Sequence, residues 1–489
     1  MRRNIHNHNW KTKKWHEQRH ILTCQLKHHT KHTKKVREEP NKKTSGPSWY
    51  VKRIRYYSVE KVKHNPKELQ NLKITALKRG NNDRILNFLL FESESPLNIE
   101  IIKMRHFNTN GLIKIPVNFS VIENSTESFS ALQELVSAVL LENNVEVSLD
   151  YYNCHNVELG TQILLDIILK DFIRFRKWLR RNNKNMLRFF TGNFQGIHIY
   201  DHNVSKMSFS VGSPVNLNIK ENTYDDVEKS YLYIHDEADP INKNLKSTEE
   251  TELEITSLSE YVINSLEKAG RTMTDEAIEN LYTVIGEALV NAEEHSSTKC
   301  RFSIGYFEKE DIDGREVGVF RLAIMNLGRT IYQKFKDTDC PNKKIVERMK
   351  QLSDSYTRHQ WFHIHKFEEE SLWTLYALQD GVSSKIKKRG SGTISIISSF
   401  FNIKGNSKRD KLSQMRILSG STCIDFDGTY DITKKCDAHG DSISVMTFNN
   451  TGNIEDKPDS NYVYCVDKFF PGTLISVTLL LDDKDTIEI

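Results

Sequence analysis

The sequence GEALVNAEEHSS, from Gly286 to Ser297, determines how the second half of this chain is interpreted. It places Glu287, Asn291 and His295 four residues apart inside an apolar pattern of helical period. The apolar stripe of the same helix comprises Leu281, Val284, Ile285, Ala288 and Ala292. The polar row borders this stripe rather than opposing it, which predicts polar groups at the rim of a core.

The helix is predicted to run from Asp275 to about Glu294, with Thr274 as its N-cap. An acidic side chain at the rim of a core can orient or deprotonate a nucleophile. An Asn amide oxygen can bind Mg²⁺ without adding charge. The alternative is an ordinary amphipathic helix whose polar rim simply meets solvent.

Three segments further along the chain carry glycines at the ends of predicted elements. AIMNLGRTI places Asn326 and Gly328 after a strand, where glycine lets the backbone approach a flat ligand and Asn can pair with a base edge. KKRGSGTISII leads into a helix whose N-terminal N–H groups can hold phosphate. Its candidate binding residues are Arg389, Gly390, Ser391, Gly392 and Thr393. PGTLISVTLLL places Gly472 and Thr473 at the start of the last strand. The chain contains no G-x-x-x-x-G-K-[ST] motif, which excludes a P-loop.

In this order, the four segments resemble the GHKL (Bergerat-fold) ATPase superfamily over residues of about 255–489. That superfamily includes gyrase-type topoisomerases, histidine kinases and anti-sigma-factor serine kinases. EALVNAEEH is similar to its N-box, and the resemblance implies that Glu287 is the catalytic acid and Asn291 the Mg²⁺ ligand. His295 either lines the nucleotide site or ends the helix. The implied cofactors are ATP and Mg²⁺.

NLGRT resembles the first glycine box, and RGSGT the second glycine box at the phosphate end. Asn326 stands where the family's Asp normally reads the adenine amino group, and Thr330 replaces the second glycine. An Asn side chain can accept that hydrogen bond or turn its amide toward another base, which leaves the base identity open. The resemblance implies that the residues between Gly328 and Gly390 form an ATP lid, which gates the site.

The order strand, helix, strand, helix, strand over residues 111–201 predicts a small α/β domain. It resembles, less specifically, the STAS domain of anti-sigma-factor antagonists. That family often carries a phosphorylatable Ser or Thr after the second of these strands. Here the loop reads Asn153–Cys154–His155–Asn156, with Thr161 further on, so the sequence does not support a phospho-switch.

The net charge of +4 conceals a basic arm at the start of the chain. Residues 1–43 hold 13 Lys and Arg against three Glu, a net of +10, which leaves −6 for the remaining 446 residues. The arm is expected to be disordered, or to contact nucleic-acid phosphates. Its seven histidines match no standard metal-ligand spacing. The seven cysteines form no C-x-x-C pair, and neither a membrane span nor a secretory signal is present, which together predict a cytoplasmic protein.

The predicted fold class is α/β followed by α+β. The predicted organisation is a basic arm at 1–45, a STAS-like domain with an N-terminal extension at 46–235, a linker at 236–255 and a GHKL sandwich with helices on one sheet face at 256–489. The leading function is an ATPase or serine/threonine-kinase-like switch acting on a protein partner or a homodimer, in bacterial signalling or defence. The alternative is a non-hydrolysing nucleotide-dependent module that regulates a protein or nucleic acid. A sensor histidine kinase is disfavoured, because His235–Asp236 ends a predicted strand and no helical phosphoacceptor His precedes the N-box.

Overall fold

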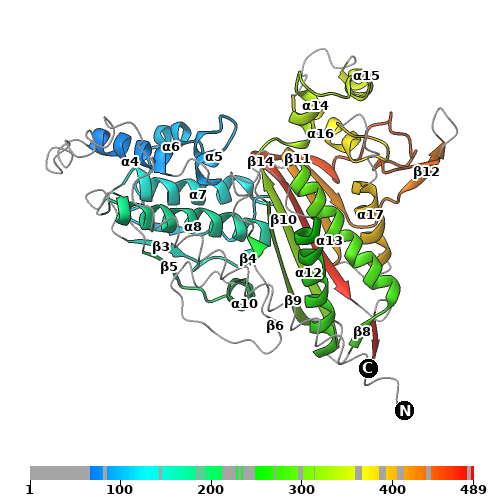
Figure 1. Cartoon of the computed structure of the whole chain (residues 1–489), viewed down its shortest axis with the longest axis horizontal. Coiled ribbons are helices and arrows are strands. Elements are labelled where there is room, and N and C mark those ends of the chain that lie inside the picture. Colours follow the sequence, from blue (N-terminus) through cyan, green and yellow to red (C-terminus); the bar gives the residue numbers. More distant parts are fainter. Residues whose placement is uncertain are drawn as a thin grey trace. The chain divides into compact units, whose positions relative to one another are not determined.

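The described part of the chain has a mixed α/β fold with parallel and antiparallel sheets (Figure 1). The computed structural model describes residues 66–80, 85–142, 146–182, 187, 189–190, 193–211, 227–228, 233–234, 248–268, 271–295, 301–312, 314–357, 366–384, 392–404, 412–436, 442–481 and 486–488. The described residues from Gln70 onward belong to one compact unit. The basic arm and His235–Asp236 lie outside the described residues. A search of the described helices finds none with the length and hydropathy that a membrane crossing requires.

The upstream part contains a three-stranded parallel sheet in the order β1-β3-β5. Its strands are β1 (Leu112–Lys114), β3 (Val147–Asp150) and β5 (Phe194–Ile197), and the short strands β2 (Asn118–Phe119) and β4 (Asn156–Val157) pair separately. Its helices are α4 (Pro66–Gly80), α5 (Ile85–Phe91), α6 (Ile99–Arg105), α7 (Ser125–Leu140), α8 (Leu159–Asn182) and α10 (His202–Ser210). The observed order β1, α7, β3, α8, β5 confirms the predicted alternation of strands and helices. Parallel neighbouring strands need such crossover helices between them.

The downstream part is built on a six-stranded sheet in which β11, β14, β10, β9 and β6 follow one another and β7 also pairs with β9. Its strands are β6 (Val227–Glu228), β7 (Tyr233–Ile234), β9 (Arg301–Ile312), β10 (Arg315–Leu327), β11 (Gln414–Phe426) and β14 (Val463–Leu481). All its pairings are antiparallel. Two further pairs are β8 (Arg271–Met273) with β15 (Thr486–Glu488), and β12 (Thr433–Cys436) with β13 (Ser442–Val445). The sequence predicted a strand before Asn326 and another at Gly472, which are β10 and β14, but not β8 and β15, which are only three residues each.

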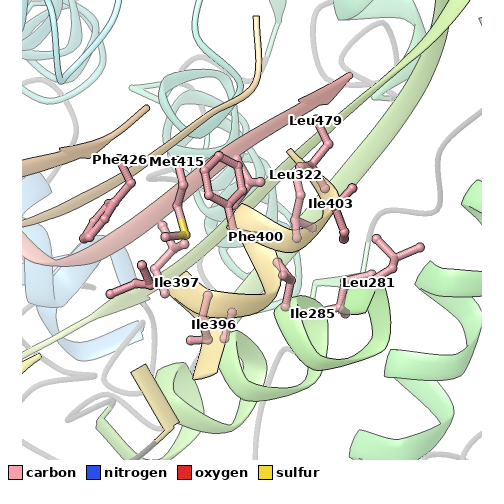
Figure 2. Packing of buried hydrophobic residues seen from close by; sticks show 14 of the residues in the cluster. Leu281, Ile285, Leu322, Ile396, Ile397, Phe400, Ile403, Met415, Phe426 and Leu479 are labelled. Atoms are coloured by element: carbon pink, nitrogen blue, oxygen red, sulfur yellow. The ribbon is translucent and has the colours of Figure 1, made fainter. Parts of the chain in front are cut away.

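The main core lies between this sheet and three helices, α12 (Thr248–Lys268), α13 (Asp275–His295) and α17 (Gly392–Ile403). Figure 2 shows Phe400 of α17 pointing toward Met415 and the strands of the sheet, and Ile403 lying near Leu322 and Leu479. The labelled core residues are Leu281, Ile285, Leu322, Ile396, Ile397, Phe400, Ile403, Met415, Phe426 and Leu479. The five apolar residues that the sequence assigned to the buried stripe of α13 are all buried, as predicted.

The opposite face of the sheet is covered by helices of the upstream part. Helix α8 contacts β10, β14 and β9, and α7 contacts β14. A Cβ on Gly160 of α8 would lie 2.6 Å from Leu474 Cδ2 of β14, so the helix and strand approach closely. Lys206 and Glu308, both buried, form an ion pair of 3.0 Å between α10 and β9. Helices therefore cover both faces of the sheet, whereas the sequence led us to expect them on one face only.

Helix α12 begins at Thr248, inside the segment 236–255 that the sequence predicted as a linker. Its first turns are highly acidic, which the sequence analysis took as a sign of a linker. Glu254 within this stretch is buried, forms an ion pair with Arg301 at 2.8 Å and accepts a hydrogen bond from Ser303 at 2.6 Å. The buried pairing of Glu254 thus stabilises the first part of α12. This pairing cannot be recognised from the spacing of apolar residues along the helix.

Replacing Phe400 by Ala is expected to lower the free energy of unfolding by about 3–5 kcal/mol, because the ring is fully buried between α13 and the sheet. Chemical denaturation measures this change. Val290→Ala is the matched control, since Val290 is exposed on α13, and its effect should stay within about 0.5 kcal/mol. Equal losses in the two variants would contradict this description of the core.

Candidate functional site

The polar row of α13 lies where the sequence placed it, beside the buried stripe. Thr274 accepts a hydrogen bond from Ala277 N at 3.2 Å, which confirms the predicted N-cap. Glu287 and Asn291 are half-buried, between the core and the exposed residues of the helix. The backbone of His295 is helical, but its side chain lies outside the described part.

Helix α13 runs toward the end of the sheet that carries Asn326. The helix starts directly after β8, and β8 pairs with β15, the strand that follows the end of β14. Its 21 residues span about 31 Å at 1.5 Å per residue. Asn326 pairs with Thr473, near the glycine-bearing part of β14 and far from its end. The C-terminal half of α13, with Glu287 and Asn291, is therefore directed toward the Asn326 end.

Four polar residues form a row across this end of the sheet. Ser419 is paired with Thr473, Thr473 with Asn326, and Asn326 with Arg301. The first three of these residues, Ser419, Thr473 and Asn326, each lie two positions along their strand from a core isoleucine. These isoleucines are Ile417, Ile475 and Ile324, which belong to the core beneath α13 and α17. Since side chains alternate along a strand, this polar row of the sheet faces the same helices, α13 and α17, as that core.

The Asn326 side chain contributes to this row a buried polar atom that has no partner among the described residues. Asn326 is only 2% exposed, and its amide nitrogen has no hydrogen-bond partner in the described part of the chain. Leaving such a donor unsatisfied costs about 1–3 kcal/mol, so native structures rarely keep one without a reason. Next to it, Ser419 Oγ and Thr473 Oγ1 are 2.9 Å apart. Ser419 also accepts from Ile331 N at 2.9 Å, which ties the row to the chain that leaves β10.

Two glycines allow the strands to meet at this point. Gly472 has a φ of 156°, and a Cβ there would lie 2.1 Å from the carbonyl oxygen of Asn326. Gly328 has a φ of 137° and donates from its N–H to Pro471 O at 3.1 Å. Both conformations are those that glycine adopts readily. The glycines thus place the Asn326 backbone against β14 and leave its side chain on the helix side.

The start of α17 lies beside the C-terminal half of α13. Asn402, near the end of α17, donates to Asn280 Oδ1 at 3.1 Å. The two helices pack along one another and share the core, with Ile403 near Leu281 in Figure 2, so they are antiparallel. Gly392, eleven residues before Ile403, therefore lies toward Asn291. Thr393 is half-buried, and Arg389, Gly390 and Ser391 lie outside the described residues.

The segment predicted as a lid contains three helices: α14 (Ile331–Lys336), α15 (Lys343–Thr357) and α16 (Lys366–Ala377). They share a small hydrophobic core of their own around Trp373. Thr330 caps α14 in a capping box, because its Oγ1 accepts from Gln333 N at 3.1 Å and its N–H donates to Gln333 Oε1 at 3.0 Å. The residue that stands in place of the second box glycine thus starts a helix.

The described part of the chain contains no group of three or more His, Cys, Asp and Glu side chains placed to hold a metal ion. Glu287 and Asn291 alone offer oxygen ligands on one helix face. Mg²⁺ commonly takes one or two protein ligands and completes its shell with phosphates and waters. The donor set at α13 therefore fits Mg²⁺ delivered with a nucleotide, and does not fit a cage made of protein alone.

Thr161 of α8 is fully buried. Its hydroxyl donates to Glu158 Oε2 at 2.7 Å and accepts from Val121 N at 2.8 Å. Burial raises the pKa of the Glu158 carboxyl, and the hydroxyl of Thr161 is the strongest influence that lowers it. These bonds tie the first turn of α8 to the segment before α7, and they occupy the hydroxyl as donor and acceptor inside the fold.

The sequence did not predict that Ser419, Arg301 and Glu254 lie in or beside this region of the sheet. Counting two residues on from Ile417 along β11 would have pointed to Ser419, but the register between strands is needed to bring it opposite Thr473. The chain matches no protein-family model, and no curated protein or solved structure matches it either. The geometry described above is therefore the basis for any functional conclusion.

Gly472→Ala is expected to lower the free energy of unfolding by at least about 2 kcal/mol more than Gly381→Ala. Both glycines have a positive φ, but a Cβ at Gly381 meets nothing within 4 Å. The pair separates backbone strain from the close approach to Asn326. Denaturant unfolding of both variants measures the difference, and equal destabilisation would mean that the strands do not meet as described.

Proposed function

We propose that this chain binds a purine nucleoside triphosphate, ATP in the first instance, together with Mg²⁺, and uses it as an ATPase or a serine/threonine-kinase-like switch. The nucleotide would lie between α13, the start of α17 and the polar row of the sheet. This proposal joins the structure to the GHKL resemblance of the sequence.

The observation that carries the proposal is the buried amide nitrogen of Asn326, which has no partner among the described residues. An Asn side chain presents one acceptor and two donors, which can pair with the edge of a purine. Its neighbour Thr473 adds a hydroxyl to the same face. A base seated here would satisfy the donor that the protein alone leaves unpaired.

The phosphate end of the site is supported by the position of α17. A helix N-terminus offers free N–H groups and a partial positive charge, which stabilise phosphate. Gly392 starts this helix toward Asn291, at the same end of the sheet as Asn326. In the proposal, the C-terminal half of α13 lies between Asn326 at the base end and the start of α17 at the phosphate end.

Glu287 and Asn291 supply the chemistry of the proposed site. Asn291 would hold Mg²⁺ through its amide oxygen, and the bound ion would neutralise charge on the phosphates. Glu287 would orient the attacking water or the hydroxyl of a substrate and accept its proton. Phosphoryl transfer depends mainly on position and charge neutralisation, which suits a site with few catalytic groups.

The upstream part of the chain would couple this site to a partner. In the proposal it is a STAS-like domain, and a protein partner or a second copy of the chain responds to the nucleotide. Helices α7 and α8 contact the face of the sheet opposite the proposed site, so both lie on the same strands. In the proposal the protein acts in the cytoplasm, since its seven cysteines form no C-x-x-C pair.

Asn326→Leu is expected to weaken nucleotide binding about tenfold or more, because it removes both hydrogen bonds to the base. Titration calorimetry with ATP and Mg²⁺ measures the affinity. Asn402→Leu is the matched control, since Asn402 is exposed and hydrogen-bonds to Asn280 at the far end of α17. Wild-type protein that binds neither ATP nor GTP would refute the proposal.

Glu287→Gln is expected to keep nucleotide binding and to lower turnover about 100-fold or more. Glu279→Gln, on an exposed position of the same helix, should leave turnover unchanged. Phosphate release, measured with and without candidate protein partners, provides the comparison. Binding by the wild type without any turnover or transfer would select the alternative, a nucleotide-dependent regulatory module.

A further inference from the structure

Three aromatic rings form an exposed cluster at the carboxyl ends of β3 and β5. Tyr152 follows β3, and His198 and Tyr200 follow β5. The ring centroids of His198 and Tyr200 are 5.7 Å apart, and Tyr152 lies edge-on to both at 6.2 and 5.9 Å. Ligands of open α/β sheets bind beside the carboxyl ends of parallel strands.

The two tyrosines are unusual among the aromatic residues of this chain. Tyr152 is 62% exposed and Tyr200 is 70% exposed. Among the Phe, Trp and Tyr residues whose side chains the structure describes, every other one is buried or half-buried. The two rings that are left in solvent are therefore neighbours, which points to a surface that another molecule covers.

The cluster is held in place by Asp150 at the end of β3. Its Oδ1 accepts from Tyr152 N at 3.1 Å and makes a contact of 2.9 Å with His198 Nδ1. His198 has a φ of 56°, a left-handed conformation that is costly for a residue other than glycine. Residues kept in such conformations are frequent at functional sites. The Asp150 carboxylate thus fixes the histidine ring against Tyr200.

The charge around the rings is negative. The segments 150–155 and 193–204, which carry the rings, contain Asp150 and Asp201 but no Lys or Arg, and Asp201 lies 3.2 Å from the ring nitrogen of His155. Lys114, opposite Asp150 on β1, is the one cation on the neighbouring strand end. The hydrogen bonds of the Asp150 side chain described above all use Oδ1, so Oδ2 can accept from a ligand. Aromatic rings attract a cation, and a carboxylate oxygen beside them that can accept a hydrogen bond strengthens this attraction.

We propose that Tyr152, His198, Tyr200 and Asp150 form a docking site for an arginine side chain of a partner polypeptide. A guanidinium group is planar, stacks on aromatic faces and donates hydrogen bonds to a carboxylate, which an ammonium group does less well. The rings would hold its face and Asp150 Oδ2 would accept from its edge. This site is independent of the nucleotide site and does not rest on the proposed function.

A nucleic acid is the other partner that exposed rings suggest, since bases stack on aromatic side chains. Binding of that kind also needs Lys and Arg to neutralise the phosphates. The two segments that carry the rings offer none, and Asp150 and Asp201 would repel the phosphates. The charge therefore favours a basic peptide over a single-stranded nucleic acid.

The test uses the full chain and a short fluorescent peptide in which arginines are spaced by glycine and serine. Fluorescence anisotropy should show binding by the wild type, weaker binding of the peptide with lysines in place of arginines, and none of the peptide with alanines. Tyr152→Ala and Tyr200→Ala should each raise the dissociation constant about tenfold. Asp150→Asn should raise it by a similar factor, since the open oxygen loses its charge.

Met104→Ala is the matched control, because Met104 is 71% exposed on α6, away from the rings. It should leave the peptide affinity unchanged. Absence of peptide binding by the wild type, or tyrosine variants that bind the peptide as tightly as the wild type does, would overturn the proposal. Tighter binding of a single-stranded oligothymidylate that is lost in the same variants would also overturn it, and would assign the rings to nucleic acid.

Discussion

The register between β10 and β14 is the constraint on which the rest of the downstream structure depends. It places Asn326 opposite Thr473, and the lack of a Cβ on Gly472 lets β14 approach the Asn326 carbonyl closely. Through the next pairs it brings Ser419 and Arg301 into the same row. A shift by one residue would turn this row to the opposite face, where α7 and α8 pack, and would expose the apolar residues to the wrong side.

The sheet then serves two neighbours at once. On one face, α13 and α17 run antiparallel over an apolar core and meet the polar row at its end. On the other face, α8 packs so closely that Gly160 has room for no larger side chain unless Leu474 moves. A ligand that changed the position of β10 or β14 would therefore also displace the upstream helices that pack on these strands. This is the physical route by which nucleotide binding would alter the upstream α/β part.

The sequence predicted the helix of Glu287 and Asn291 well, because its apolar period and its Thr274 cap are local signals. It also predicted the long strands and the alternating α/β order upstream. It did not predict that Ser419 joins Asn326, because the pairing of β11 with β14 links residues far apart in the chain. The early start of α12 was hidden because Glu254 is stabilised by Arg301, a partner about fifty residues away. The aromatic cluster around His198 was missed for the same reason.

The most direct test of the central claim follows the side-chain amide of Asn326. In protein labelled at asparagine, the Asn326 amide signal is assigned by its loss in Asn326→Asp. Addition of ATP and Mg²⁺ should shift this signal strongly, since the unpaired nitrogen gains an acceptor on the base, while the signal of Asn402 should stay in place. A saturating nucleotide that leaves the Asn326 signal unmoved would contradict the account.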